Sequence, residues 1–573
     1  MRRFGRIPAG VAVVVLAFLT GCSTSLIVDD EHRPVRNTHA PVDDPQYAAA
    51  AATNDCRIDE LYGDELRAHD PSKQAFERGL ALSGGGMRAA TFAMGVLEAL
   101  QKKDELPRVD VVSSVSGGGY TWGWYVSHVV NEDDPKKLFD IDGPYQQLIG
   151  KRANLTPKTI SLGIAGSNLF PGALWNLFAN GLFGWHANAS PGRHFYEHRL
   201  RRTFNTEPVG PNDAVYINRT WADYRQAVKD GKIPTFILNA AVLLDDDPKH
   251  ISGRMANLNY EFTPWHHGND AYGYASGDPP FDLPRAISIS GGALDLLNLT
   301  PGFSQKLFIS AIDFDIGYSM NNPGYERPLR SAGGPAVRDV ECGLRKVAVR
   351  GKSGEVTRWE RFREMITPFP LYLGKPWYAR HKGGSRLYLS DAGFSDNLGA
   401  YSLIRRMTRD IIIVDATQED PAHGYDFGAY KTLQRAVHDE MDAVLSVPTI
   451  DAVVAHTADF DPRTPVMAGT VRSFPTARNP NPVTLNIIYV KLSMNPDISV
   501  YPDVLQTYYR DVGARRRFPY ESTGDQQYDD VRFRAFRALG YTIGMCIPRF
   551  GSFSMKVDPP CYLNKQQESS PAP

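Results

Sequence analysis

The chain of 573 residues has only five cysteines, and no two of them form a CxxC pair. A structural zinc site built from cysteines is therefore not expected, because such sites draw their thiolates from closely spaced pairs. An excess of charge of one sign is also missing, since 63 lysines and arginines balance 64 aspartates and glutamates. Without basic clusters, the sequence predicts neither a nucleic-acid partner nor membrane binding through a polybasic patch.

The N-terminal region has the pattern of a secretion signal. Three arginines within the first six residues precede an apolar run at residues 11–18, which is too short to span a bilayer. The run ends in the letters LTGC, which resemble the lipobox of bacterial lipoproteins, where the cysteine is acylated. We expect residues 1–21 to be a lipoprotein signal peptide and Cys22 to carry the lipid, with a plain secretory signal as the alternative.

Lipidation would place the protein in the cell envelope, because several acyl chains hold a protein stably at a bilayer. Ser23 after the cysteine fits sorting to the outer membrane, facing the periplasm or the cell surface. Residues 22–55 are rich in Ala, Asp, Pro and Thr without helical or strand periodicity, and we expect them to form a flexible tether.

The other four cysteines are candidates for disulfides, which an oxidising compartment permits. Four cysteines allow three pairings. The most economical pairing joins Cys546 to Cys561 and leaves Cys56 for Cys342.

Residues 56–563 have the pattern of an α/β fold. Short β-branched runs alternate with helical patterns, which predicts a mainly parallel central sheet between helices, a three-layer α/β/α arrangement with insertions. Residues 564–573 form a polar tail that we expect to be disordered. The runs that we assign to strands lie at residues 80–82, 109–115, 235–238, 307–312, 387–389 and 411–414.

A glycine-rich turn follows the first predicted strand, where residues 80–88 (LALSGGGMR) contain Gly84, Gly85 and Gly86. Glycines let the backbone approach a ligand, and exposed N–H groups at a helix start favour a phosphate or the oxyanion of acyl transfer. The string is neither GxGxxG nor a Walker loop, which disfavours nucleotide binding. Arg88 lies close to the positive end of the helix, an unfavourable place for a cation that indicates a role in binding charge.

A second strand-to-helix turn has the pattern of a nucleophile elbow. Residues 109–119 (VDVVSSVSGGG) pass from an apolar strand into small residues around Ser116, as the sharp turn of a GxSxG motif requires. Ser114 stands where that motif has its first glycine. A similar string around Ser290 (SISGG) shows that the local pattern is not specific. The preceding strand and the upstream glycine loop favour Ser116.

A serine nucleophile needs a base, and an aspartate follows a later predicted strand. In residues 387–398 (LYLSDAGFSDNL), Asp391 comes to a turn at the strand's carboxyl end, the usual place for active sites in open α/β sheets. A desolvated carboxylate within hydrogen-bond reach can accept the serine proton. We interpret Asp391 as the base and Asp396 as a helix cap.

Three strings, in this order and spacing, resemble the oxyanion loop, nucleophile elbow and base motif of the patatin and cytosolic phospholipase A superfamily: SGGGMRA, SVSGGGYTWGWYV and LSDAGFSDNLGAYSLIRR. Residues 260–264 (YEFTP) also resemble a string of cytosolic phospholipases and fungal phospholipase B. Two positions depart from the pattern, because Ser114 and Ala392 stand where patatins commonly have glycine.

The resemblance implies a lipid acyl hydrolase of the phospholipase A or lysophospholipase type, which cleaves carboxylic esters of membrane lipids without a metal or cofactor. It implies a Ser116–Asp391 dyad without histidine and places Arg88 near the substrate phosphate. It also implies an oxyanion hole formed by the backbone of the glycine loop, residues 84–86.

Three alternatives stay open. A Ser-His-Asp esterase would need a histidine after Asp391, and three are available: His423, His438 and His456. His194 and His198 match the HxxEH string of a class of zinc peptidases and would lie on one helix face. A lipoprotein that binds lipid without catalysis is the third, because fold does not guarantee activity.

Residues 159–192 contain no charged side chain when histidine is counted as neutral. They are expected to form either a pair of core helices or a lid that meets acyl chains beside the active site, and periodicity does not separate the two.

Overall fold

The computed structural model describes residues 64–68, 70–73, 75–131, 134–139, 200, 219–242, 258–269, 273–276, 278–292, 317–321, 338–342, 345–349, 386–420, 422, 424–474, 482–523 and 528–553. Several sequence predictions fall outside these residues: the signal peptide, Cys22, the tether, the 159–192 segment, the HxxEH histidines, His423, the strand at 307–312 and the tail.

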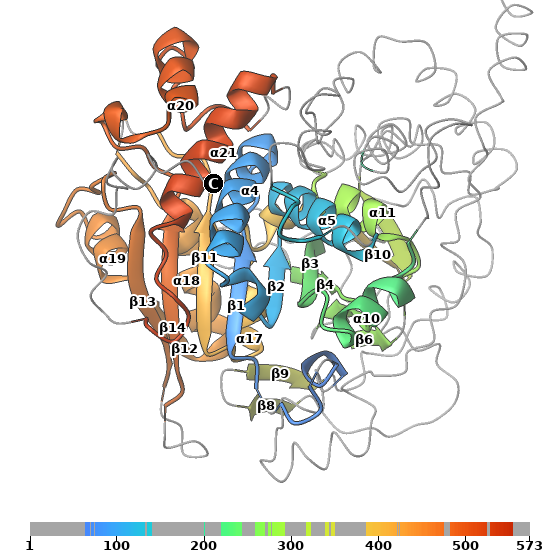
Figure 1. Cartoon of the computed structure of the whole chain (residues 1–573). Coiled ribbons are helices and arrows are strands. Elements are labelled where there is room, and N and C mark those ends of the chain that lie inside the picture. Colours follow the sequence, from blue (N-terminus) through green and yellow to red (C-terminus); the bar gives the residue numbers. More distant parts are fainter. Residues whose placement is uncertain are drawn as a thin grey trace, which may run out of the picture.

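One sheet of 12 strands forms the centre of the described part of the chain (Figure 1). The five middle strands are parallel and lie in the order β14 (Thr484–Lys491), β11 (Asp410–Asp415), β1 (Arg78–Leu82), β2 (Val111–Ser114) and β3 (Thr235–Val242). Antiparallel strands extend this centre on both sides: β13 (Val466–Ser473) and β12 (Ala443–Ser446) beyond β14, and β4 (Leu258–Phe262), β5 (His266–Asn269) and β6 (Gly273–Ser276) beyond β3.

Helices cover both faces of the parallel centre, which confirms the predicted three-layer fold (Figure 1). Successive side chains of a strand point to opposite faces, so in β1 Leu80 and Leu82 pack on one side and Ala81 on the other. The first side carries α4 (Gly86–Lys102), α5 (Gly117–Val130) and α21 (Asp530–Gly544). The second side carries α17 (Tyr401–Arg405), α18 (Gly428–Met441) and α19 (Pro448–Val454).

The strand that leads to Asp391 does not run parallel to the centre of the sheet. This strand, β10 (Arg386–Ser390), pairs antiparallel with β3, where Leu389 lies opposite Val242 and Ser390 opposite Ala241. Its other neighbour is β7 (Tyr318–Asn321), also antiparallel. Asp391 nevertheless follows the carboxyl end of a strand, as the sequence interpretation expected. β10 begins beyond the carboxyl end of β3 and runs back toward it, so that only its last two residues pair with β3. The carboxyl end of β10 therefore lies near the carboxyl ends of the parallel strands.

The remaining elements lie around this frame: η2 (Leu106–Arg108), α10 (Trp221–Lys229), α11 (Leu283–Ser290), the β8 (Arg338–Cys342) and β9 (Arg345–Val349) hairpin, η4 (Ala392–Phe394), η5 (Ile498–Val500), α20 (Asp503–Tyr508) and η6 (Tyr509–Gly513). In the described part of the chain, no helix is both long enough and apolar enough to span a bilayer. Cys546 is in a disulfide, as predicted, and its partner lies among the residues whose side chains are not described.

Candidate active site

Ser116 occupies a strained turn between β2 and α5. Its φ of 47° and ψ of −114° lie outside the regions that side chains ordinarily adopt. The turn closes tightly on the glycine loop, because a Cβ on Gly117 would lie 2.1 Å from the carbonyl oxygen of Gly86. A Cβ on Gly118 would lie 2.4 Å from the carbonyl oxygen of Leu82. These contacts explain why small residues follow Ser116, as the sequence interpretation of an elbow required.

The structure brings Ser116 and Asp391 together although 275 positions separate them in the chain. The Oγ of Ser116 lies 3.1 Å from Oδ2 of Asp391, a hydrogen-bond distance. Both side chains are almost fully buried, with exposed fractions of 5 % and 4 %. A carboxylate in this position can accept the hydroxyl proton of the serine.

The loop after β10 fixes the direction of the Asp391 carboxylate. Asp391 caps η4, because its Oδ1 accepts the N–H of Gly393 at 2.7 Å and leaves Oδ2 to face Ser116. Asp396 is not the helix N-cap expected from the sequence, because the N-cap of α17 is Ala400. The oxygens of Asp396 accept the N–H groups of Leu398 at 3.0 Å and Tyr401 at 2.7 Å instead. Two aspartates of one loop thus have different tasks.

The glycine loop supplies backbone N–H groups beside the elbow, but not all three glycines are available. The N–H of Gly84 donates to the carbonyl oxygen of Asn397 at 2.9 Å. The assignment of an oxyanion-binding amide to Gly84 is therefore wrong, because its donor is already in use. Within the described part of the chain, the N–H groups of Gly85 and Gly86 have no acceptor, and no side chain caps the start of α4.

Positive φ angles of 134° at Gly85 and 60° at Gly86 explain why this loop is made of glycine. Gly85 lines the same cavity as Ser116. Donors at the start of a helix favour an anionic oxygen.

Arg88 is buried in the wall of this cavity rather than exposed at its mouth, with an exposed fraction of 1 %. Its Nε donates to the carbonyl oxygen of Ala416 at 2.9 Å and its Nη1 to that of Glu521 at 2.5 Å. Burial lowers the pKa of the guanidinium below its ordinary value. Arg88 thus joins α4 to two loops of the cavity wall, and contact with a substrate phosphate stays a prediction.

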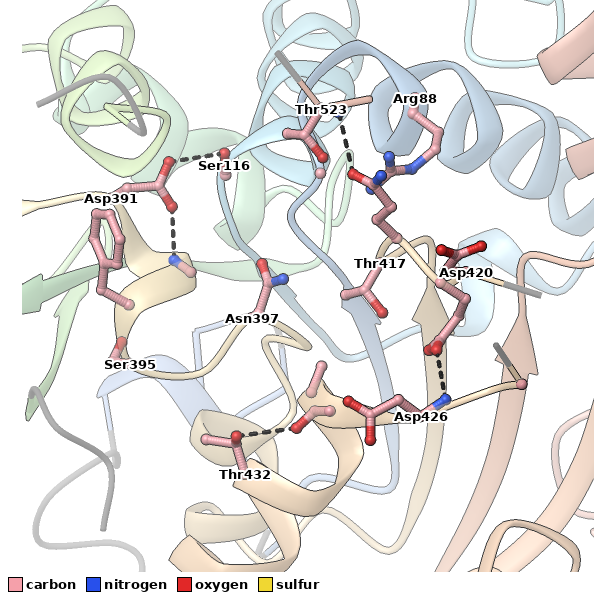
Figure 2. A pocket seen from close by; sticks show the side chains of 18 residues that line it. Arg88, Ser116, Asp391, Ser395, Asn397, Thr417, Asp420, Asp426, Thr432 and Thr523 are labelled. Atoms are coloured by element: carbon pink, nitrogen blue, oxygen red, sulfur yellow. Dashed lines mark hydrogen bonds between the residues drawn. The ribbon is translucent and has the colours of Figure 1, made fainter. Parts of the chain in front are cut away.

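Ser116 and Asp391 open onto a cavity of about 670 Å³. Figure 2 shows the pair on one side of the cavity and Thr417, Asp420 and Asp426 on the other. The volume is in the range of small-molecule sites. Most of the residues that line it have polar side chains, and these provide hydrogen-bonding groups opposite the serine.

A buried lysine that the sequence interpretation missed holds the far wall. Lys491 at the end of β14 has no exposed surface, and its Nζ donates to Asp415 at 2.8 Å, to Glu419 at 2.9 Å and to the hydroxyl of Thr417 at 3.1 Å. Burial would raise the pKa of Asp415, but the charge of Lys491 outweighs it and lowers that pKa. The apolar run at residues 487–490, followed directly by a lysine, was the only sequence signal for this network.

The serine of the second SxSGG-like string also lies at the site, in a role that its pattern did not indicate. Ser290 is the last residue of α11, and its Oγ accepts the backbone N–H of Ser116 at 2.9 Å. It does not follow a strand, which agrees with the choice of Ser116 as the nucleophile.

The histidines considered for a triad do not lie at the cavity where the structure describes them. His438 is exposed and pairs with Asp439, and His456 is exposed after α19. His267 is buried against the hydroxyl of Tyr260, and burial, together with His266, lowers its pKa to about 3. Among the described residues, no group of three or more His, Cys, Asp or Glu side chains could hold a metal ion.

Fold and site together define an α/β protein with a serine on a strained strand-to-helix turn, a carboxylate beside it and a glycine loop at a helix start. Residues 80–294 match the model of the family described as patatin-like phospholipase. The chain therefore carries a domain of the patatin-like superfamily, and this region includes the glycine loop, the elbow and Ser290. No curated protein is significantly similar to the chain.

Solved structures that match the chain include human GIVD cytosolic phospholipase A2, which is 14 % identical, with a TM-score of 0.46 over 87 % of this chain and 63 % of that one. The same human protein with bound methyl gamma-linolenyl fluorophosphonate and terbium is 13 % identical, with a TM-score of 0.40 over 87 % and 62 %. ExoU of Pseudomonas aeruginosa, in complex with SpcU, is 19 % identical, with a TM-score of 0.17 over 38 % of each chain. The chain thus spans less than two thirds of the length of the human protein.

Proposed function

We propose that the protein is a lipid acyl hydrolase that cleaves carboxylic esters with Ser116 as nucleophile and Asp391 as general base. One observation carries the proposal: the buried 3.1 Å contact between Ser116 Oγ and Asp391 Oδ2, at a cavity inside a patatin-like fold. A lone buried serine and aspartate would have no need of a strained backbone, whereas a nucleophile that must face a ligand does.

In the proposed mechanism, Asp391 takes the proton of Ser116 while Oγ attacks the ester carbonyl carbon. The N–H groups of Gly85 and Gly86 stabilise the negative oxygen of the tetrahedral intermediate. When the ester bond breaks, Asp391 returns the proton to the departing alkoxide, and the acyl group stays on Ser116. A water molecule then gives its proton to Asp391, attacks the acyl-enzyme and releases the fatty acid, while Ser116 regains its proton.

The substrate proposed is an acyl ester of a membrane lipid, a phospholipid or lysophospholipid. Acylation of Cys22 and a place at the outer membrane would bring the enzyme to that substrate, and this part of the proposal rests on the sequence alone. Labelling of cells with an alkyne fatty acid tests it: the wild type should incorporate the label, and a Cys22→Ala variant that keeps it would contradict lipidation at this residue.

A fluorophosphonate probe and a turnover assay on mixed lipids, with products identified by mass spectrometry, test the catalytic proposal. We expect Ser116→Ala to lose labelling, and Ser116→Ala and Asp391→Asn each to lose at least about 1,000-fold in turnover with little change in Tm. Ser127→Ala is a matched control, because Ser127 is buried on α5 and shares its hydrogen bond with the hydroxyl of Tyr224 rather than with the cavity. Its turnover should stay near wild type.

Three outcomes would overturn the assignment. Labelling that persists in Ser116→Ala excludes Ser116 as the nucleophile. Full turnover in Asp391→Asn removes Asp391 as the base and favours a base such as His423, whose alanine variant would then be inactive. Turnover that a chelator abolishes favours a metal-dependent reaction.

A further inference from the structure

Ser290 contacts the backbone of Ser116 from the far end of the matched domain. The two residues lie 174 positions apart, and α11 carries Ser290 to the elbow at its last turn. Ser290 has no exposed surface, so water does not compete for its hydroxyl. The 2.9 Å distance between Ser116 N and Ser290 Oγ is that of a well-formed hydrogen bond.

The backbone around Ser116 shows why this contact matters. Two nearby N–H groups have main-chain acceptors: Val115 donates to Leu82 at 3.0 Å, and Gly118 donates to Val115 at 2.8 Å and to Ser83 at 3.1 Å. Ser116 lies between them with a positive φ, and in the described part of the chain its own N–H has no main-chain acceptor. A side-chain oxygen from another element therefore accepts this buried donor.

We propose that Ser290 is a positioning residue for the nucleophile: its hydroxyl oxygen holds the N–H of Ser116 and keeps the elbow in its strained conformation. The proposal rests on the function proposed for Ser116 and deepens it. A strained residue persists only when its surroundings over-determine it. With the hydrogen bond gone, the elbow relaxes, and the Oγ of Ser116 loses its alignment with Asp391 and with the ester carbonyl.

The position of α11 supports this role, because the helix is anchored at its other end. Asp282 caps α11 by accepting the N–H of Arg285 at 3.2 Å, and the indole N–H of Trp221 donates to the carbonyl oxygen of Phe281 at 2.5 Å. Leu283, Ile287 and Ile289 are buried in the main core. A helix held in this way presents Ser290 at a fixed place.

The same helix offers a matched control in Ser288. This serine is also fully buried, but its Oγ donates to the carbonyl oxygen of Arg285 inside the helix at 2.8 Å. Ser288→Ala and Ser290→Ala each remove a hydroxyl oxygen from the same helix. Only Ser290→Ala removes a hydrogen bond to Ser116.

The test measures kcat and KM per active site, titrated with the fluorophosphonate probe, and the maximal rate constant of probe inactivation. We expect Ser290→Ala to lower kcat and the inactivation rate constant about 10-fold with KM nearly unchanged, since a lost buried acceptor corresponds to roughly this factor. Ser290→Thr, which keeps the hydroxyl, should recover most of the loss. Ser288→Ala should match the wild type in both rate constants.

Counting only titrated sites prevents a partly unfolded preparation from imitating the effect. The positioning role would be overturned if Ser290→Ala had the kcat of the wild type. It would also be overturned if Ser288→Ala lowered kcat as much as Ser290→Ala does. These outcomes are separable from failure of the proposed function, which would show as turnover by Ser116→Ala whatever happens at Ser290.

Discussion

Asp391 and Asp396 show how position alone gives one residue type two roles. Asp391 uses one oxygen for a cap and turns the other toward Ser116, while Asp396 accepts backbone N–H groups with both of its oxygens. Burial raises the pKa of Asp396 to about 6, against the opposing effect of the N–H donors of Tyr401 and Leu398. The second aspartate therefore titrates within the range in which proteins are commonly studied.

This shift predicts a pH-dependent stability that Asp396→Asn should remove. An aspartate in the unfolded chain has a pKa of about 3.9, so the folded state binds the proton more tightly. The resulting stabilisation is fully present below about pH 4 and is lost as pH rises through about 6, by a few kcal/mol at most. Urea unfolding of both proteins at several pH values measures it. If the difference in the free energy of unfolding between the wild type and Asp396→Asn does not vary with pH, the prediction is contradicted.

At the scale of elements, the crossing of α4 with α21 fixes the glycine loop, because α4 begins at that loop. The two helices touch through glycines: a Cβ on Gly95 would lie 2.0 Å from the carbonyl oxygen of Arg537, and one on Gly540 would lie 2.1 Å from that of Phe92. These are backbone atoms, which cannot rotate out of the way as a side chain could. The helices must separate if either glycine acquires a side chain.

Gly540→Ala should therefore lower the free energy of unfolding by at least about 1–3 kcal/mol, the usual cost of overpacking. Gly428→Ala is the control, because its Cβ would meet only the carboxylate of Asp426, at 3.3 Å, at the first residue of α18. That variant should unfold close to the wild-type Tm. Thermal unfolding followed by circular dichroism compares the two, and equal Tm values would show that the α4–α21 crossing tolerates a methyl group.

At the scale of the whole molecule, Arg406 connects three distant parts of the chain. Its guanidinium pairs with Glu65 near the start of the described residues and with Glu261 on β4, with distances of 2.9 Å to each. All three side chains are almost fully buried. Burial would raise the pKa of Glu261, but Arg406 and Arg405 outweigh it and hold the pKa at about 2.

Removing this arginine should destabilise the entire domain. Arg406→Met takes the guanidinium away from two buried carboxylates and leaves His266, at 3.2 Å, as the ion-pair partner of Glu65. We expect a loss of about 3–5 kcal/mol in the free energy of unfolding. Adding Glu65→Gln and Glu261→Gln should recover part of the loss, since no buried charge then remains. In the wild type, the contribution of Glu261 is present above about pH 4.5 and is lost as pH falls toward 2. A loss below about 1 kcal/mol in Arg406→Met, measured by urea unfolding, would refute the role of this network.

The sequence was enough to recognise several strands, the glycines of the first turn and the two candidate catalytic residues. The apolar runs of β1, β2, β3, β10 and β11 were assigned correctly, because period and side-chain type are local properties. Glycines at positions 85 and 86 are also dictated locally, by positive φ. Ser116 and Asp391 could be named as a pair because each follows a strand.

Residue type and order are thus enough to specify the strands and turns, whereas the packing of distant segments fixes which polar groups are already hydrogen-bonded. The antiparallel direction of β10, the use of the Gly84 N–H by Asn397, the carbonyl partners of Arg88 and the contact of Ser290 with Ser116 all join distant segments. Such partners depend on how strands pair and helices pack. A residue's type and immediate neighbours set its own conformation, but not the atom that will lie within hydrogen-bond distance of it.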